Sequence, residues 1–63
     1  MRFVLLPLVS GESIGINVAE ISVICPVKKG TRVKLKDGDF YDVQEELIEV
    51  FDALQRCLSN YPV

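Results

Sequence analysis

Hydrophobic and polar residues alternate through the first two-thirds of the chain, and hydrophobic residues recur at helical spacing after that. Three glycine-containing breaks, at 10–13, 28–30 and 37–38, separate the alternating runs. Alternation between such breaks is typical of β-strands joined by short turns. The pattern predicts strands at about residues 2–9, 13–18, 21–27, 31–36 and 40–43.

The first run is apolar at every position from Phe3 to Val9 except Pro7. An uninterrupted apolar run indicates burial on both faces. Pro7 removes one backbone donor, which favours a sheet edge or a bulge at that position. One face can cover the core of the chain, and we expect a second subunit to cover the other.

The Asp-Gly pair at 37–38 defines the clearest hairpin. A two-residue turn would place Asp42 opposite Val33 on the apolar face, whereas a three-residue loop at 36–38, with its glycine left-handed, places Tyr41 there. A slip of one residue moves every side chain to the other face, so the three-residue loop is predicted. The predicted pairs are Thr31 with Val43, Arg32 with Asp42, Val33 with Tyr41 and Lys34 with Phe40.

The same argument applied to 28–30 predicts a second three-residue loop. It pairs Val27 with Thr31, Cys25 with Val33, and Val23 with Leu35. The predicted inner face is Val23, Cys25, Val33, Leu35, Tyr41 and Val43, and the outer face carries Ile24, Arg32, Lys34, Phe40 and Asp42. Residues 17–20 are expected to form a tight turn or one helical turn, and the register around 10–13 stays open.

After Val43 the hydrophobic period becomes helical, with apolar residues at 47, 50, 51, 54, 57 and 58. This stripe predicts a helix over about 44–58, with Asp42 as N-cap and a stop at Ser59 and Asn60, before Pro62. The expected fold is α+β: one domain over 1–63, an antiparallel β-meander of four to five strands, then one C-terminal amphipathic helix.

The chain is small for its hydrophobic content, with 63 residues of which 49% are hydrophobic. Domains of this size bury only about 60% of their unfolded surface, and many rely on disulfides, metals or partners. Two cysteines and no histidine provide neither a disulfide framework nor a zinc set, and Cys25 and Cys57 fit small buried hydrophobes. We therefore predict a homo-oligomer. The expected interface residues are Phe3, Leu5, Leu6, Leu8, Ile48 and Phe51.

Charge is segregated along the chain, although the net charge is only −2. Five of the seven basic residues lie within 28–36, and seven of the nine acidic residues lie within 37–52. The basic cluster can be a solvated hairpin paired with the acids, as Arg32 with Asp42, or a site for a small anionic ligand. The candidate ligand-binding residues are Lys28, Lys29, Arg32, Lys34 and Phe40. The negative net charge argues against nucleic acid.

Nothing in the pattern points to catalysis. The chain has no histidine and no phosphate-binding or dinucleotide motif, so we assign no catalytic residue, metal or cofactor. The apolar run near the N-terminus is too short for a membrane span and lacks a signal-peptide cleavage site. A cytoplasmic location with reduced thiols is expected.

Residues 11 to about 54 resemble the FlbD-like or SwrD-like family of small bacterial flagellar proteins. The matching features are Gly11-Glu12, Ile16-Asn17, Ile21, VKLKDG at 33–38, Tyr41, Val43, Glu45, Val50 and Leu54. The resemblance implies a β-meander whose glycine hairpin leads into a terminal helix, and it carries no catalytic residues. The chain departs from the family pattern, with Asp-Gly in place of Asn-Gly and Asn17-Val18 in place of Asn-Pro. Small phage proteins share this spacing of hydrophobic residues around a glycine turn.

Three functional hypotheses follow. The first is a non-enzymatic, homo-oligomeric interaction or regulatory protein with a protein partner. The second is a phage-type inhibitor that sequesters an anionic, nucleotide-like ligand between subunits. The third, implied by the resemblance alone, is a flagellar accessory protein.

Overall fold

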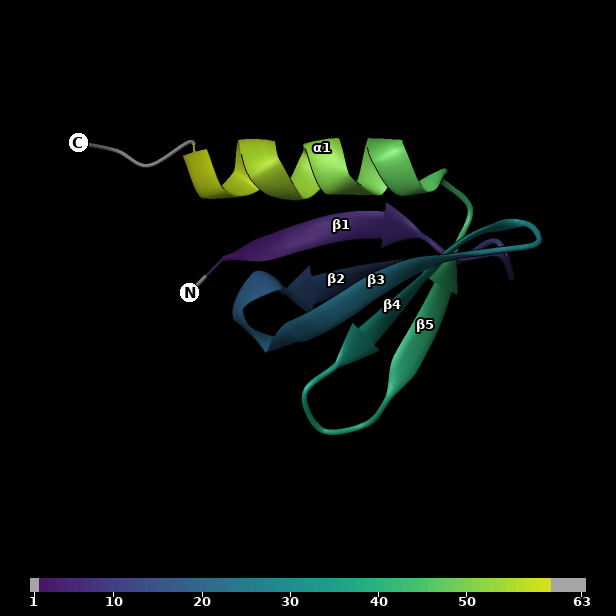
Figure 1. Cartoon of the computed structure of the whole chain (residues 1–63), viewed down its shortest axis with the longest axis horizontal. Helices are drawn as coiled ribbons and strands as arrows, with labels where there is room; N and C mark the ends of the chain where they lie inside the picture. The colour runs from purple at the N-terminus through teal and green to yellow at the C-terminus, as the bar shows by residue number, and fades with distance from the viewer. Residues whose placement is uncertain (1, 60–63) are drawn as a thin grey trace.

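The computed structural model describes residues 2–59 and has five antiparallel strands followed by one helix (Figure 1). This confirms the predicted α+β class. The strands are β1 (Phe3–Pro7), β2 (Ser13–Asn17), β3 (Ile21–Val27), β4 (Gly30–Leu35) and β5 (Phe40–Val43), and the helix α1 spans Leu47–Ser59. A single 3-10 turn, η1 (Val18–Glu20), joins β2 to β3 as expected for residues 17–20.

The strands form two sheets, the hairpin β1–β2 and the three-stranded sheet β3–β4–β5. The sheets meet where the chain beyond β1 reaches β5, through a bridge between Leu8 and Val43. The Gln44 amide donates to the Pro7 carbonyl at 2.9 Å, and the Val9 amide donates to the Asp42 carbonyl at 3.0 Å. The first hairpin is therefore held against the edge strand β5.

The predicted register of β4 and β5 is confirmed. Arg32 pairs with Asp42 and Val33 with Tyr41, and Gly38 closes the loop with a φ of +99°. A positive φ is a conformation that glycine adopts without steric cost, which is why the three-residue loop forms here. Tyr41 shares the face of Val33 but remains exposed.

The predicted register of β3 and β4 is wrong by one residue. Val27 pairs with Gly30 across a tight turn at 28–29, and Ile24, not Cys25, lies opposite Val33. The pairing then shifts at a bulge between Ile21 and Val23. As a result Ile24 packs against the core, whereas Val23 is 49% exposed.

The helix begins three residues later than predicted, and Asp42 is not its N-cap. Asp42 lies in β5, where its carboxylate binds Arg32. The Glu46 amide instead donates to Oε1 of Glu49 at 3.1 Å, which is half of a capping box. The helix runs to Ser59 within the described residues, and the predicted stop signals Asn60 and Pro62 lie outside them.

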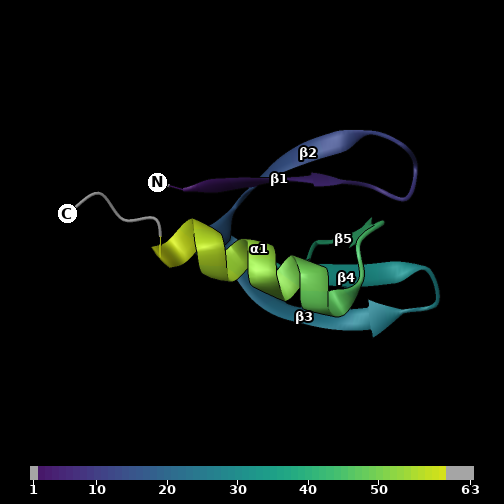
Figure 2. The same ribbon diagram turned by 90° about the horizontal axis from the view of Figure 1, so that it is seen from above.

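One small core joins the helix to both sheets. Seen from above, α1 lies between β1 and β3 (Figure 2), and it contacts β1, β3 and β4. Thr31 is buried among these apolar residues, and its hydroxyl donates to the Glu45 carbonyl at 2.7 Å. The buried hydrophobic residues are Leu6, Ile16, Val33, Val43 and Val50. Among residues 2–59, no helix is long and apolar enough to cross a membrane.

Candidate interaction surfaces

The first exposed apolar surface is the outer face of the β1–β2 hairpin, which we call the hairpin surface (Phe3 and Leu5). These residues are 58% and 74% exposed, whereas Leu6, the next residue along β1, is buried in the core. A side chain added at Gly15 would meet the Phe3 ring at 3.9 Å, so this ring lies beside the glycine on the neighbouring strand. The alternation separates the run from Phe3 to Val9 into one buried face and one open face.

The second exposed apolar surface is a groove between α1 and β3, which we call the helix groove. Ile24, Leu47, Ile48 and Phe51 line it, and it encloses about 230 Å³. Ile48 is 71% exposed and Phe51 is 49% exposed. Apolar side chains at i, i+1 and i+4 on the first turns of α1 form one wall, and Ile24 of β3 forms the other.

The predicted interface residues divide between these two surfaces and the core. Phe3 and Leu5 form the hairpin surface, and Ile48 and Phe51 line the helix groove. Leu6 is 1% exposed and Leu8 packs against the core, so neither is available to a partner. Ile24 was not among the predicted interface residues, and the expected register placed it on the outer face of the sheet, whereas it lies opposite Val33.

Arg32 is the most constrained of the predicted ligand-binding residues. Its Nε and Nη2 donate to the two carboxylate oxygens of Asp42 at 2.8 and 3.1 Å, and its guanidinium lies 4.2 Å from the centroid of the Phe40 ring. The hydrogen bond with Asp42 raises the pKa of Arg32, and the same hydrogen bond lowers the pKa of Asp42. The guanidinium is therefore already occupied by a carboxylate and an aromatic face.

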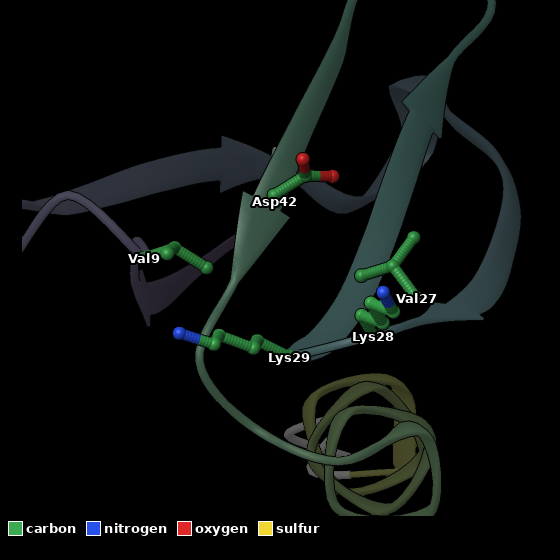
Figure 3. A pocket seen from close by; sticks show the side chains of 5 residues that line it. All are labelled: Val9, Val27, Lys28, Lys29 and Asp42. Atoms are coloured by element: carbon green, nitrogen blue, oxygen red, sulfur yellow. The ribbon is translucent and has the colours of Figure 1, made fainter.

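The structure separates the remaining basic residues into two places. Lys34 lies on the outer face of the three-stranded sheet, paired with Val23 and Phe40 in the ladder. Lys28 and Lys29 form the turn between β3 and β4. They line an open hollow of about 260 Å³ together with Val9, Val27 and Asp42 (Figure 3).

The four lysines of the basic cluster have no acidic partner among residues 2–59. Within residues 2–59, the ion pairs join Arg32 to Asp42 and Arg56 to Asp52. Lys28, Lys29, Lys34 and Lys36 make no ion pair in that part of the chain. Of the basic residues in this cluster, only Arg32 therefore forms the predicted ion pair with the acidic segment in the described part of the chain.

Comparisons with protein-family models, with curated proteins and with solved structures gave no match to this chain. The resemblance to the FlbD-like or SwrD-like family remains a prediction. The surfaces described above are therefore the basis for a functional assignment.

Proposed function

We propose that this protein is a non-enzymatic interaction module that works as a homo-oligomer. The carrying observation is that a chain of 63 residues exposes two separate apolar surfaces, at the hairpin and at the helix groove. Scattered hydrophobic residues are normal on a protein surface, but contiguous apolar patches mark contact sites. Self-association supplies the burial that so small a core lacks.

Native mass spectrometry of the protein purified from its host tests this proposal. The expected result is an oligomer of the chain, and affinity capture with the same protein is expected to recover a stoichiometric macromolecular partner. A mass equal to one chain at all concentrations would contradict self-association. An oligomer that captures no macromolecule would contradict the role as an interaction module.

A second candidate function is the binding of a small anion between subunits. Lys28 and Lys29 support it, because they lack acidic partners within residues 2–59 and flank an open hollow. Asp42 opposes it, because its carboxylate lines the same hollow, although Arg32 neutralises much of that charge. Arg32 already binds the carboxylate of Asp42. The better candidate anion site is therefore the turn at Lys28 and Lys29, not the outer face of the sheet.

Denaturing the purified oligomer tests the second function. An anionic ligand would appear as extra mass on the native species and would be lost on denaturation. Lys28→Ala and Lys29→Ala should remove that mass while leaving assembly unchanged, with Lys36→Ala as the control outside the hollow. Retention of the ligand by both variants would contradict binding at the turn.

A further inference from the structure

The helix α1 carries two stripes of mainly apolar residues, and the core uses only one of them. Val50 and Leu54 face the core. A second stripe, which we call the helix flank, consists of Ile48, Phe51, Gln55 and Leu58, all of them exposed. Its spacing of three, four and three residues is that of a seam between two packed helices. The helix flank continues directly into the helix groove, which shares Ile48 and Phe51.

We propose that two copies of this chain dock through the helix flank and helix groove, with their α1 helices antiparallel. The proposal rests on the self-association argued above and names the surface that performs it. In this arrangement Ile48 faces the partner's Leu58, and Phe51 faces the partner's Gln55. The same patch serves both subunits, as a two-fold interface requires.

Charge determines the antiparallel direction. The acidic residues Glu46, Glu49 and Asp52 lie at the start and in the first half of α1, and Arg56 lies in its last turn. A parallel seam would place the acidic halves side by side, where like charges repel. An antiparallel seam places each acidic half beside the partner's Arg56, which already contacts Asp52 of its own helix at 3.5 Å in an exposed pair. The two helix dipoles then also point in opposite directions, which is the favourable arrangement.

The area that a dimer needs explains why the groove belongs to the interface. A stable interface buries about 800 Å² per partner, which is a little under a fifth of the 4505 Å² of accessible surface. A helix of 13 residues is only about 20 Å long, so its flank alone offers too little. The groove adds Leu47 of α1, and its opposite wall at Ile24 extends the contact onto β3.

The other apolar and open features are less suited to self-association. On the hairpin surface, Phe3 lies beside Gly15 and so already has a structural use in covering that glycine. The free edge of β3 carries Pro26 and a bulge after Ile21, two features that block edge-to-edge pairing. The hollow at the β3–β4 turn is lined by both lysines and Asp42.

A charge-pair exchange tests the seam. Ile48→Glu and Leu58→Lys replace side chains that are 71% and 50% exposed, so each variant should keep the fold. The two positions lie about 15 Å apart on one helix, too far for a pair within a subunit. Each single variant should raise the dimer dissociation constant at least about tenfold, measured by sedimentation equilibrium.

The double variant Ile48→Glu, Leu58→Lys should recover affinity relative to both single variants, because each glutamate then meets the partner's lysine. Leu5→Lys on the hairpin surface is the matched control and should leave the dissociation constant unchanged. Circular dichroism should show the same helix content in all variants.

Three results would overturn the proposal. Dissociation by Leu5→Lys but not by Ile48→Glu would keep self-association and move it to the hairpin surface. A double variant weaker than both singles would contradict the antiparallel direction. A wild-type chain that is monomeric at every concentration would overturn both this inference and the proposed function, and would leave the groove to a partner of another sequence.

Discussion

Two glycines with positive φ occupy different surroundings in this molecule. Gly30 opens β4 with a φ of +113°, and a side chain there would collide with the Val43 carbonyl and crowd that of Gln44. Gly38 has a φ of +99° and nothing within 4 Å of the same position. Gly30 is thus required by backbone conformation and by close packing, whereas Gly38 is required by conformation alone.

Gly30→Ala is expected to destabilise the protein more than Gly38→Ala. The backbone conformation costs about 1–3 kcal/mol in either variant, and Gly30→Ala must also displace the connection between β5 and α1. Urea denaturation of the two variants at equal protein concentration measures the difference. Equal losses of unfolding free energy would contradict the close approach at Gly30.

At the scale of elements, the Arg32–Asp42 pair links β4 to β5 across the outer face of the sheet. Both side chains are about one-third exposed, so solvent weakens their attraction. The hydrogen bond from Arg32 lowers the pKa of Asp42 below its ordinary value of 3.8. A carboxyl group whose pKa is lowered by folding stabilises the folded state at any pH above its ordinary pKa. That stabilisation is lost as the pH falls through the lowered pKa of the folded state.

Asp42→Asn should therefore be less stable than wild type at pH 7, and the difference should shrink as the pH falls below 3.8. The measurement is the free energy of unfolding in urea between pH 7 and pH 2. Asp39→Asn, in the exposed loop before β5, is the control for the general effect of removing one carboxylate. A difference between Asp42→Asn and wild type that is independent of pH would contradict the role of the ion pair.

At the scale of the whole molecule, the helix packs on a core that both sheets share, and hydrogen bonds around the Leu8–Val43 bridge join the sheets at one end. Val50 is fully buried in the core that both sheets share. The core has only five buried hydrophobic residues in the described part of the chain. A chain of this size has a free energy of unfolding of about 3–9 kcal/mol. Each of the five residues therefore contributes a large part of it.

Val50→Ala should lower the free energy of unfolding by about 2 kcal/mol, from lost burial and the cavity left behind. Both sheets should still unfold together, in a single transition seen by circular dichroism and by tyrosine fluorescence. Val23→Ala, at a half-exposed position of β3, is the matched control and should cost less than about 1 kcal/mol. Two separate transitions for Val50→Ala would show that the hairpin and the three-stranded sheet do not share one core.

Local pattern predicted most of the elements, because alternation and helical spacing arise from chain geometry alone. The β4–β5 register followed from the parity of Val33 and Tyr41 and from one glycine that tolerates a left-handed backbone. Ile48 and Phe51 were predicted as contact residues because the apolar surface of the helix, with Phe51 in its main stripe and Ile48 beside it, is wide for so small a core. Leu6, in contrast, was predicted as an interface residue and lies in the core, because a strand that is apolar on both faces does not show which face is buried.

What the sequence by itself determined is therefore the order of five strands and a helix, one hairpin register and the apolar content of the first strand. The tertiary structure alone decided the β3–β4 register, because Gly30 packs against a carbonyl thirteen residues away. It also decided the helix start, because Arg32 engages the carboxylate that was expected to cap it. Both depend on contacts between segments distant in sequence, and such contacts leave no periodic signal in the chain.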